Sequence, residues 1–430
     1  MTIDELYELY RQHPVVTTDT RDCPEGSIFF ALRGASFNGN DFALKALEAG
    51  CAYAVVDDPA VGGDERLVHV PDVLTALQQL AAHHRRRLAT PVVQVTGTNG
   101  KTTTKELMAA VLGEKYNVLC TRGNLNNHIG VPLTLLRLRP EHEVAVVETG
   151  ASHPGEIAAL SRIVDADCGL ITNVGKAHLE GFGSFEGVVR TKGELYDYLR
   201  AKAGGFIFLH ADDGLLRGIA GDLRAETYGR PGQGYGVEGE VLAGAPFLQL
   251  RWRPCSGEWQ EVRTQLVGAY NVDNVLAAAA VGLHFGVEPA QISHAVAAYR
   301  PTNNRSELVD TGRNRLVVDA YNANPTSMAA ALENFRLMEH GAKMAILGEM
   351  RELGDASAGE HRRVVELAEA AGCAELWFVG EAYRPWAGDH RVFADVGEVK
   401  QTLHDTPLSG RLILIKGSNG TRLFQLPELL

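Results

Sequence analysis

Short apolar runs alternate with segments of helical spacing through the middle of the chain. A strand predicted over residues 92–96 leads into a Gly-rich loop, and a helix is predicted to follow over 102–114. A further helix is predicted over 185–199. This alternation is typical of βαβ units on a mainly parallel sheet. The other apolar runs that predict strands here lie at 144–148, 169–173 and 206–209.

Two changes of pattern follow toward the C-terminus. A polar, Gly-rich stretch at 228–268 predicts antiparallel strands and turns, and an Ala-rich helix is predicted over 271–285. Because Pro301 disfavours helix at the residue before it, we interpret 299–304 as a linker. The alternation then restarts, which predicts a second, smaller doubly wound unit. Its strands are predicted at 316–319, 344–347, 376–379 and 412–415.

The beginning of the chain mixes short strands and helices. Residues 27–32 and 52–56 predict strands, and 73–88 has helical spacing. The basic run that starts at Arg85 ends this helix, and we expect it to be solvated. The chain is therefore predicted to be an α/β protein of three units, residues 1–88, 89–300 and 301–430.

Composition and charge narrow the possible partners and location. The 430 residues carry 41 Lys and Arg against 53 Asp and Glu, a formal net charge of −12. We expect no nucleic-acid partner, and no membrane insertion, because no apolar run approaches the roughly 20 residues that span a bilayer. The six scattered cysteines form no CxxC pair, and the start of the chain has no signal-peptide pattern. We expect a cytoplasmic protein that is a monomer.

The clearest motif is a phosphate loop between a predicted strand and a predicted helix. Backbone N–H groups of such a loop bind phosphate oxygens, Lys101 reaches the outer phosphates, and Thr102 places its hydroxyl on Mg²⁺. The strict Walker pattern needs glycine where this chain has Val95, so the match is a variant. A chance Gly-Lys-Thr before a helix is the alternative. The expected nucleotide-binding residues are Gly97, Thr98, Asn99, Gly100, Lys101, Thr102 and Thr103.

Three further side chains are candidates, each with an ordinary alternative. Glu148 ends a predicted strand, where a carboxylate can hold Mg²⁺ or make a local hydrogen bond. His178 follows the next strand and is either functional or merely exposed. Lys192 lies on a predicted helix, where a lysine is usually solvated.

A family resemblance adds to these candidates. The segment Thr96-Gly-Thr-Asn-Gly-Lys-Thr-Thr resembles the phosphate loop of the Mur ligases and folylpolyglutamate synthases, ATP-dependent enzymes that join an amine to a carboxylate. The resemblance implies a Mur ligase architecture. Its parts are a small N-terminal α/β domain for a UDP-linked substrate, a central P-loop domain for ATP and a C-terminal Rossmann-like domain.

The resemblance also implies roles at the metal site. Asn173-Val-Gly-Lys-Ala-His resembles the Mur segment whose histidine contributes to a second Mg²⁺ site, which is His178 here. The lysine that matches Lys192 is carbamylated by CO₂ in the family and then acts as an oxygen ligand. The implied metal ligands for two Mg²⁺ ions are Thr102, Glu148, His178 and carbamylated Lys192. The expected catalytic residues are Lys101, Glu148, His178 and Lys192.

Further along, the resemblance implies contacts to the rest of the nucleotide. Gly268-Ala-Tyr-Asn-Val-Asp-Asn resembles the family segment that meets adenine, so Asn271 and Asn274 are expected there, although Asn271 could equally cap the helix. Arg305 matches an arginine that contacts phosphate, with Asn304 in place of the family's glycine. Asp319 ends a predicted strand and is expected to accept a ribose hydroxyl.

Two segments point to one branch of the family. Asp319-Ala-Tyr-Asn-Ala-Asn-Pro and Gly123-Asn-Leu-Asn-Asn-His-Ile-Gly resemble signatures of the Mur ligases that add D-alanyl-D-alanine. Near the N-terminus, Thr18-Asp-Thr-Arg resembles the UDP-sugar-binding segment. The implied substrate-binding residues are Thr20, Arg21, Asn124, Asn126, Asn127, Asn322 and Asn324.

The function implied is an ATP-dependent ligation of D-alanyl-D-alanine to a UDP-MurNAc-tripeptide through an acyl phosphate. Closure of the C-terminal domain, hinged near 299–303, is expected to keep water from that intermediate. Two alternatives stay open. One is a neighbouring ligase that adds the third residue of the peptide or adds glutamate to folate, and the other is a non-catalytic nucleotide-binding module.

Overall fold

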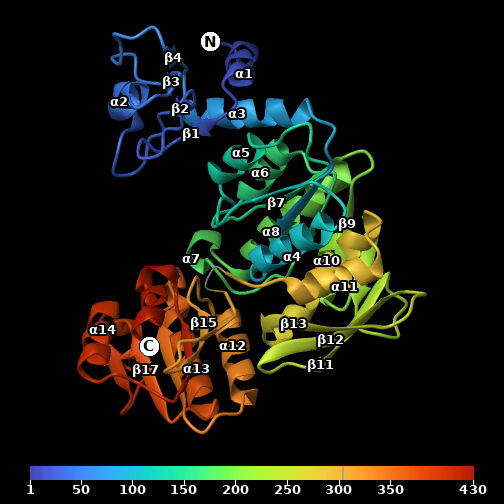
Figure 1. The fold of residues 1–430 in the computed structure, drawn as a ribbon, viewed down its shortest axis with the longest axis vertical. Coiled ribbons are helices and arrows are strands. Elements are labelled where there is room, and N and C mark those ends of the chain that lie inside the picture. The colour runs from blue at the N-terminus through green and yellow to red at the C-terminus, as the bar shows by residue number, and fades with distance from the viewer. Residues whose placement is uncertain (303–304) are drawn as a thin grey trace.

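Within the described residues, three β-sheets of four, nine and six strands follow one another along the chain. The computed structural model describes residues 1–302 and 305–430. Asn303 and Asn304 lie outside the described residues. The end of the expected linker and hinge falls there, and so does Asn304, the residue that stands in place of the family's glycine. Figure 1 shows the three units one below another, with the N-terminus at the top and the C-terminal unit at the bottom.

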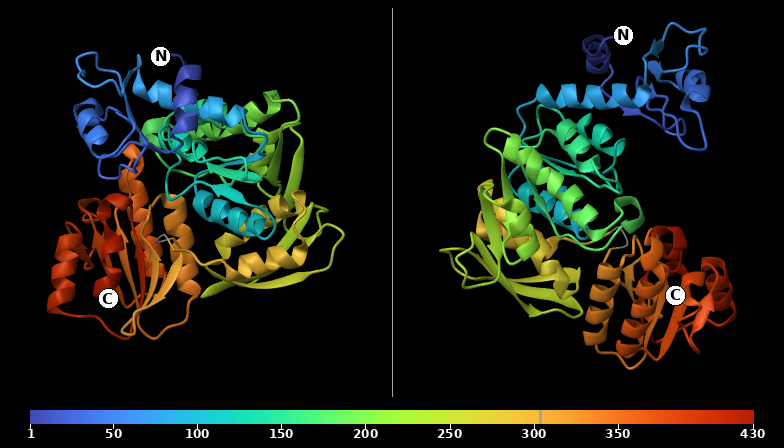
Figure 2. Two further views of the ribbon diagram at one scale, coloured as in Figure 1. Left: turned by 45° about the horizontal axis from the view of Figure 1, so that its top comes forward. Right: turned by 180° about the vertical axis from the view of Figure 1, so that it is seen from behind.

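The N-terminal sheet is parallel throughout, with the strand order β1-β2-β3-β4. The Asp72 side chain accepts a hydrogen bond from the Thr75 N–H at 2.7 Å and so starts the long helix α3. This helix packs against α1 on one side and against two helices of the central unit on the other, and Figure 2 shows it spanning both units. The elements are α1 (Ile3–Gln12), β1 (Val16–Thr17), β2 (Ile28–Phe30), α2 (Ala43–Glu48), β3 (Tyr53–Val56), β4 (Leu67–His69) and α3 (Val73–Arg86).

The solvated helix end expected for the basic run holds for Arg86 and Arg87, which are exposed, and is wrong at Arg85. The Arg85 side chain is 6% exposed and forms an ion pair with Asp167, with Nη2 and Oδ2 3.0 Å apart. It also donates to the carbonyl oxygens of Val164 and Asp165 at the end of a central helix. Carbonyls at a helix C-terminus lack partners within the helix, and a guanidinium with five N–H donors satisfies several of them at once.

The central unit is one nine-stranded sheet, of order β13-β12-β11-β10-β9-β8-β5-β7-β6. Its strands from β6 to β11 pair in parallel, and β11, β12 and β13 are antiparallel, as the sequence predicts for 228–268. Strand β5 lies between β7 and β8, so the chain reverses direction across the sheet at β5. Ligands of open α/β sheets bind outside the strand ends at such a point.

The sequence predictions for this unit place the main strands and helices within a few residues. The strands are β5 (Val92–Thr96), β6 (Val118–Cys120), β7 (Val144–Glu148), β8 (Cys168–Ile171), β9 (Phe206–His210), β10 (Ala225–Gly229), β11 (Val237–Ala243), β12 (Phe247–Pro254) and β13 (Gln260–Val267). The helices are α4 (Lys101–Gly113), α5 (Gly130–Leu135), α6 (Glu156–Val164), α7 (Leu179–Phe182), α8 (Phe185–Ala201), α9 (Gly214–Ala220), α10 (Val272–His284) and α11 (Pro289–Ala298).

The C-terminal unit is a six-stranded sheet, of order β14-β15-β19-β16-β17-β18, in which only β14 pairs antiparallel. All residues of β16 and β19 are buried, as expected for parallel strands with helices on both faces. The elements are β14 (Glu307–Asp310), β15 (Arg315–Asp319), α12 (Pro325–Leu337), β16 (Lys343–Gly348), α13 (Ser357–Ala370), β17 (Glu375–Val379), β18 (Arg391–Phe393), α14 (Val396–Asp405) and β19 (Leu412–Lys416).

The α/β class expected from the sequence is confirmed, and the domain limits at residues 88 and 300 stay predictions. Helix α3 complicates the first limit because its buried residues share a hydrophobic cluster with the central helices α5 and α6. All six cysteines carry free thiols. Among the described residues, no helix combines the length and the apolar character needed to cross a membrane.

Candidate active site

A cavity of about 710 Å³ opens at the strand ends around β5 and reaches the C-terminal unit. The wall includes the phosphate loop, the ends of β7 and β8, the start of α10 and the loop between β15 and α12 of the C-terminal unit. The expected site residues that line it are Gly97, Thr98, Asn99, Gly100, Lys101, Thr102, Thr103, Asn126, Asn127, Glu148, His178, Lys192, Asn271, Asn274, Arg305, Asp319, Asn322 and Asn324.

The phosphate loop has the backbone that its glycines allow. Gly97 and Gly100 have φ of +140° and +79°, and a Cβ at Gly97 would collide with the hydroxyl oxygen of Thr172. Helix α4 then begins at Lys101 with no side-chain cap, so its first N–H groups point toward the cavity. The Lys101 ammonium donates to the carbonyls of Gly97 and Thr98 at 2.8 and 2.9 Å. Burial lowers the pKa of Lys101 to about 8, although Glu148 favours its charged form.

Glu148, at the end of β7, is suited to a hard cation. Its side chain is buried, and Oε1 accepts hydrogen bonds from the Thr102 hydroxyl at 3.2 Å and the Asn126 amide at 2.8 Å. The second oxygen, Oε2, is buried and has no hydrogen-bond partner among the described residues. A buried carboxylate oxygen without a donor is costly unless a cation satisfies it. Carboxylate, hydroxyl and amide oxygens are also the ligands that Mg²⁺ prefers, so these residues fit the ion.

Two more expected metal ligands lie further along the wall. His178 follows β8 and has a left-handed backbone, with φ of +49°. Burial lowers the pKa of its ring, although the neighbouring Glu352 favours the charged form. Lys192, on α8, is 3% exposed, and its ammonium lies 3.4 Å from the Ala151 carbonyl. Burial, and then the charge of Lys101, lower the pKa of Lys192 to about 7.

The ligand types present limit what this wall can hold by itself. Within residues 1–302 and 305–430, no three His, Cys, Asp or Glu side chains converge as a metal site would require. A cation at Glu148 would therefore take its remaining ligands from hydroxyl and amide groups, from bound phosphate and from water. His178 and Lys192 line the same cavity without any hydrogen bond to Glu148.

The two asparagines expected at adenine have partners inside the protein. The Asn271 amide donates to the Val267 carbonyl at 2.9 Å, and the Asn274 amide donates to Asn271 Oδ1 at 2.8 Å. Asn274 Oδ1 accepts from the Thr104 hydroxyl at 2.9 Å and lies against Gly100. Asn274 thus ties α10 to the phosphate loop, whatever contact it also makes with a nucleotide.

Asparagines also connect the loop to the substrate side of the cavity. Asn126, expected to bind substrate, lines the cavity and donates to Glu148, which it thereby orients. Asn127 accepts a hydrogen bond from the Gly130 N–H at 2.9 Å at the start of α5, and it also lines the cavity. Asn124 is exposed and lies outside the cavity wall.

The C-terminal unit supplies the opposite wall. The Asn324 side chain caps α12 and donates to Asn99 Oδ1 at 2.7 Å, which links the two units at the phosphate loop. The Arg305 guanidinium lies 3.7 Å from the ring centre of Tyr321, and its Nε is buried without a partner among the described residues. Asp319 is paired with Lys416, with Nζ and Oδ2 2.5 Å apart.

Sequence reasoning missed Lys416 and Glu352 as parts of this region. Lys416 ends the apolar strand β19 and is 1% exposed. A lysine at the end of a buried parallel strand is a signal that could have identified it. No local pattern pairs Glu352 with His178, because the two residues lie 174 positions apart in the sequence.

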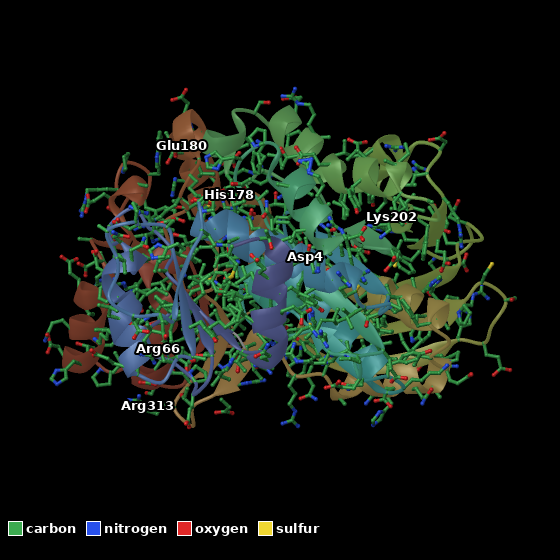
Figure 3. All side chains as sticks on the ribbon, turned by 90° about the horizontal axis from the view of Figure 1, so that it is seen from above. Asp4, Arg66, His178, Glu180, Lys202 and Arg313 are labelled. Atoms are coloured by element: carbon green, nitrogen blue, oxygen red, sulfur yellow. The ribbon has the colours of Figure 1, made fainter. Side chains whose placement is uncertain are left out.

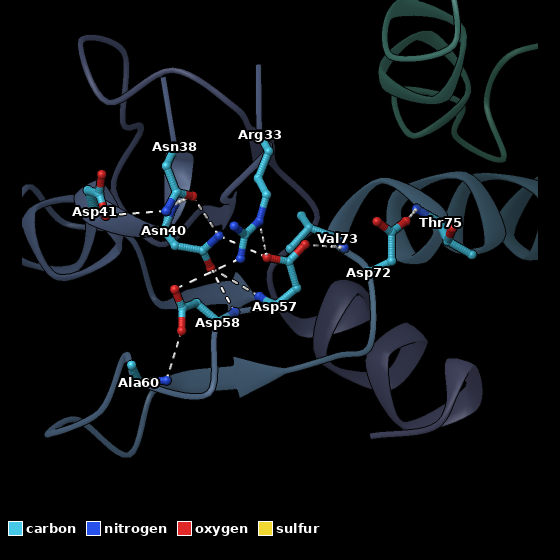
Figure 4. A network of polar contacts seen from close by, with 10 residues as sticks. All are labelled: Arg33, Asn38, Asn40, Asp41, Asp57, Asp58, Ala60, Asp72, Val73 and Thr75. Atoms are coloured by element: carbon cyan, nitrogen blue, oxygen red, sulfur yellow. Dashed lines mark hydrogen bonds and ion pairs between the residues drawn. The ribbon is translucent and has the colours of Figure 1, made fainter. Parts of the chain in front are cut away.

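The N-terminal residues expected to bind substrate lie away from this cavity. The Arg21 side chain is 88% exposed and pairs with Asp19, and Thr20 lies beside them. Another arginine stands at the ends of the N-terminal strands. The Arg33 Nε donates to Asp57 at 2.9 Å, while Asn40 bonds the same carboxylate from within the network that Figure 4 shows. Arg33 is half-exposed there.

A cavity between a phosphate loop and a separate α/β unit defines a P-loop enzyme that acts on a nucleotide between two domains. Family models match residues 14–85 (Mur ligase family, catalytic domain), 95–282 (Mur ligase middle domain) and 304–419 (Mur ligase, glutamate ligase domain). The chain belongs to the Mur ligase family, and the resemblance stated from its sequence is confirmed.

Relatives extend over nearly the whole chain. The UDP-N-acetylmuramoyl-tripeptide--D-alanyl-D-alanine ligase of Bacillus subtilis (strain 168) is 35% identical over 421 residues, 95% of this chain and 91% of that protein. MurF from Acinetobacter baumannii superposes with a TM-score of 0.85 at 32% identity, covering 96% of this chain and 92% of that one. MurF ligase from Thermotoga maritima in complex with ADP superposes with a TM-score of 0.83 at 26% identity, covering 96% of each chain. The chain is an ATP-dependent ligase of this family.

Proposed function

We propose that this ligase joins D-alanyl-D-alanine to the terminal carboxylate of UDP-MurNAc-tripeptide, a step in making peptidoglycan precursors. The observation that carries the proposal is the placement of Asn322 and Asn324 in the cavity wall, with Asn324 bonded to the phosphate loop at Asn99. These residues belong to the segment that resembles the D-alanyl-D-alanine-adding ligases. The name of the Bacillus subtilis relative supports the same substrates. It favours them over those of a ligase that adds the third residue of the peptide or adds glutamate to folate.

The reaction has two steps. The tripeptide carboxylate attacks the γ-phosphorus of ATP, and the bond between that phosphorus and the β–γ bridging oxygen breaks. ADP departs, and the tripeptide carries an acyl phosphate. The dipeptide amine then attacks the acyl carbon, loses a proton and expels phosphate as the amide forms. The first step brings anionic oxygens together, so Lys101 and the N–H groups at the start of α4 stabilise it by opposing their repulsion.

The metal requirement follows from the side chains around Glu148. Thr102, Glu148 and Asn126 would hold Mg²⁺, directly or through water. When bound, the ion supplies positive charge to the phosphate oxygens. Glu148 keeps its place because Thr102 and Asn126 both donate to one of its oxygens, which leaves the other free for the cation.

Lys192 is proposed to carry the carbamate that the family resemblance implies, and to serve a second Mg²⁺ together with His178. CO₂ adds only to a neutral amine, and burial lowers the pKa of Lys192 to about 7, which leaves much of it neutral near that pH. The carbamate would convert a buried cation into an anion with two oxygens. Short carboxylates restoring activity to Lys192→Ala would support this, and no rescue by any of them would count against it.

Closure of the C-terminal unit is proposed to shield the acyl phosphate from water. Contacts between the loop after β8 and α13 support a docked arrangement, among them an ion pair of Lys176 with Glu360 at 2.8 Å. Since the reaction consumes ATP, we also propose that it takes place in the cytoplasm.

The decisive experiment follows phosphate release from ATP with Mg²⁺ and UDP-MurNAc-tripeptide, with and without D-alanyl-D-alanine. The expected result is release that needs both substrates, and a UDP product heavier by one dipeptide less water. Turnover with UDP-MurNAc-dipeptide and a free amino acid would indicate the third-residue ligase instead. ATP binding without turnover of any acceptor would indicate a non-catalytic module.

A further inference from the structure

Glu352, in the loop that follows β16, contacts the ring of His178 across the junction of the central and C-terminal units. The contact joins Glu352 Oε2 to Nδ1 of the ring. A second bond secures the approach, because the Glu352 carbonyl accepts from the Glu180 N–H at 3.3 Å. Figure 3 marks His178 and Glu180, which both belong to this junction. The carboxylate and the backbone of one residue therefore both hold the start of α7.

Both residues of this contact have unusual backbones. His178 and Glu352 have φ of +49° and +60°, in the left-handed region that residues other than glycine rarely adopt. Such conformations are costly and persist where the surroundings enforce them, often at functional sites. The strained backbone on each side presents the two side chains to one another.

The C-terminal unit builds the position of Glu352 from its own core. Met350 and Leu353 on either side are buried, and the Met350 N–H donates to Nε2 of the buried His361 at 3.0 Å. The Glu352 side chain itself is 54% exposed. An exposed ion pair contributes little to folding, so the contact is better explained by what it does to His178.

Resting on the proposed function, we propose that Glu352 is a positioning residue for His178. Its carboxylate accepts the Nδ1–H of the neutral ring, which leaves the lone pair on Nε2 for the cavity. Histidines that ligate metals are commonly oriented by a carboxylate on their other nitrogen. Because Glu352 belongs to the C-terminal unit, His178 acquires this tautomer only when that unit is docked.

The test reads the tautomer directly, without metal or substrate. Two-bond ¹H–¹⁵N spectra of full-length protein with ¹⁵N-labelled histidine assign the His178 ring by comparison with His178→Gln. We expect the Nδ1–H form in the unsubstituted protein and in Glu352→Gln, whose amide oxygen still accepts the proton. Glu352→Ala is expected to shift the ring toward the Nε2–H form. Asp355→Ala is the matched control, since it removes the same charge from an exposed position three residues away and leaves the ring unchanged.

Turnover gives the second measurement. Glu352→Ala is expected to lower kcat about tenfold, because loss of the carboxylate that orients a metal-ligating histidine typically has an effect of this size. Tm should be unchanged, and KM for ATP should stay close to that of the unsubstituted protein. An Nε2–H ring in the unsubstituted protein, or the same ring spectrum in Glu352→Ala, would overturn the inference. Failure of the proposed function can be distinguished from failure of this inference. In that case the spectrum would still show the Nδ1–H ring, but the protein would turn over no acceptor.

Discussion

Lys176 and Glu360 form an ion pair between the central and C-terminal units, with Nζ and Oε1 2.8 Å apart. The pair is asymmetric. The Lys176 side chain is 50% exposed, whereas that of Glu360 is 9% exposed and its Oε2 has no hydrogen-bond partner among the described residues. The lysine thus reaches from a solvated loop to a carboxylate largely withdrawn from water, and docking of the two units covers that carboxylate.

Lys176→Ala is expected to weaken docking of the C-terminal unit. The substitution removes the nearer cation of the buried Glu360 carboxylate and leaves only Arg363, whose Nη1 lies 4.0 Å from Oε2, at a cost of about 1–3 kcal/mol that undocking relieves. Small-angle scattering with saturating ADP should show a larger radius of gyration for the variant. The control is Arg362→Ala, which breaks an exposed pair with Glu366 on the same helix. Identical scattering for Lys176→Ala and unsubstituted protein would contradict the prediction.

Glu148→Gln is expected to abolish the response to Mg²⁺ while leaving binding of the bare nucleotide. The amide retains an oxygen for Thr102 and Asn126 but loses the negative charge that attracts the cation. Thermal unfolding should show that Mg²⁺ adds stability to the ADP complex of the unsubstituted protein and adds none to that of the variant. Turnover should fall at least a hundredfold. If Mg²⁺ stabilised the ADP complex of the variant as much as that of the unsubstituted protein, the cation would have to bind away from Glu148.

Asn274→Ala is expected to weaken nucleotide binding through the phosphate loop. The side chain connects α10 to Thr104 and packs against Gly100, so its loss frees the loop and leaves the Thr104 hydroxyl unpaired. One lost buried hydrogen bond of this kind is worth about 1–1.5 kcal/mol, or roughly tenfold in Kd for ADP. Calorimetric titration with ADP measures it. Asn124→Ala, an exposed change outside the cavity, should leave that Kd unaltered.

Local sequence pattern located the strand ends that form the site, because the carboxyl ends of neighbouring parallel strands meet at one edge. Lys101, Glu148 and His178, which lie at or after such strand ends, line one cavity. The sequence pattern could not assign the partners of Asn126 and Asn274, since an amide has the same appearance in a sequence whether it faces ligand or protein. Whether an asparagine amide contacts ligand or protein depends on which distant segments of the chain lie beside it in the folded structure.

The same limit explains the errors at other positions. Arg85 belongs to a basic run at a helix end, which is usually solvated, yet α6 and Asp167 enclose it. The sequence around Glu352 does not indicate its relation to His178, which arises only when the C-terminal unit docks on the central one. Burial and pairing between units are properties of the tertiary structure.

Arg21→Ala tests the substrate role predicted for the N-terminal unit. Because the Arg21 side chain is 88% exposed and pairs only locally with Asp19, its removal should leave Tm unchanged. Loss of a cation that meets the substrate diphosphate should raise KM for the UDP-linked substrate about tenfold, with KM for ATP unaffected. Steady-state kinetics with each substrate varied in turn measures both. Arg33→Ala should behave alike if the half-exposed Arg33 shares that contact.

Lys192 should make the protein more stable as pH rises above 7. Burial lowers the pKa of Lys192 from 10.5 to about 7 in the folded chain. Between these values the unfolded chain binds a proton that the folded chain does not, so unfolding becomes less favourable with increasing pH, by at most about 1.4 kcal/mol per unit. Below pH 7 both states hold the proton, and the folded state retains the full cost of a buried ammonium.

Lys192→Met isolates this contribution, since the variant buries a side chain of similar length without the charge. The rise in unfolding free energy between pH 7 and 9 should be steeper for the unsubstituted protein than for Lys192→Met, both in CO₂-free buffer. Lys101, whose pKa burial lowers to about 8, adds a slope of the same sign to both proteins, so the difference between the two profiles reports Lys192 together with its repulsion from Lys101. Lys45→Met, at an exposed position on α2, should leave the slope unchanged. Parallel pH profiles for Lys192→Met and unsubstituted protein would mean that the ammonium remains hydrated, and would remove the physical basis for carbamate formation at this lysine.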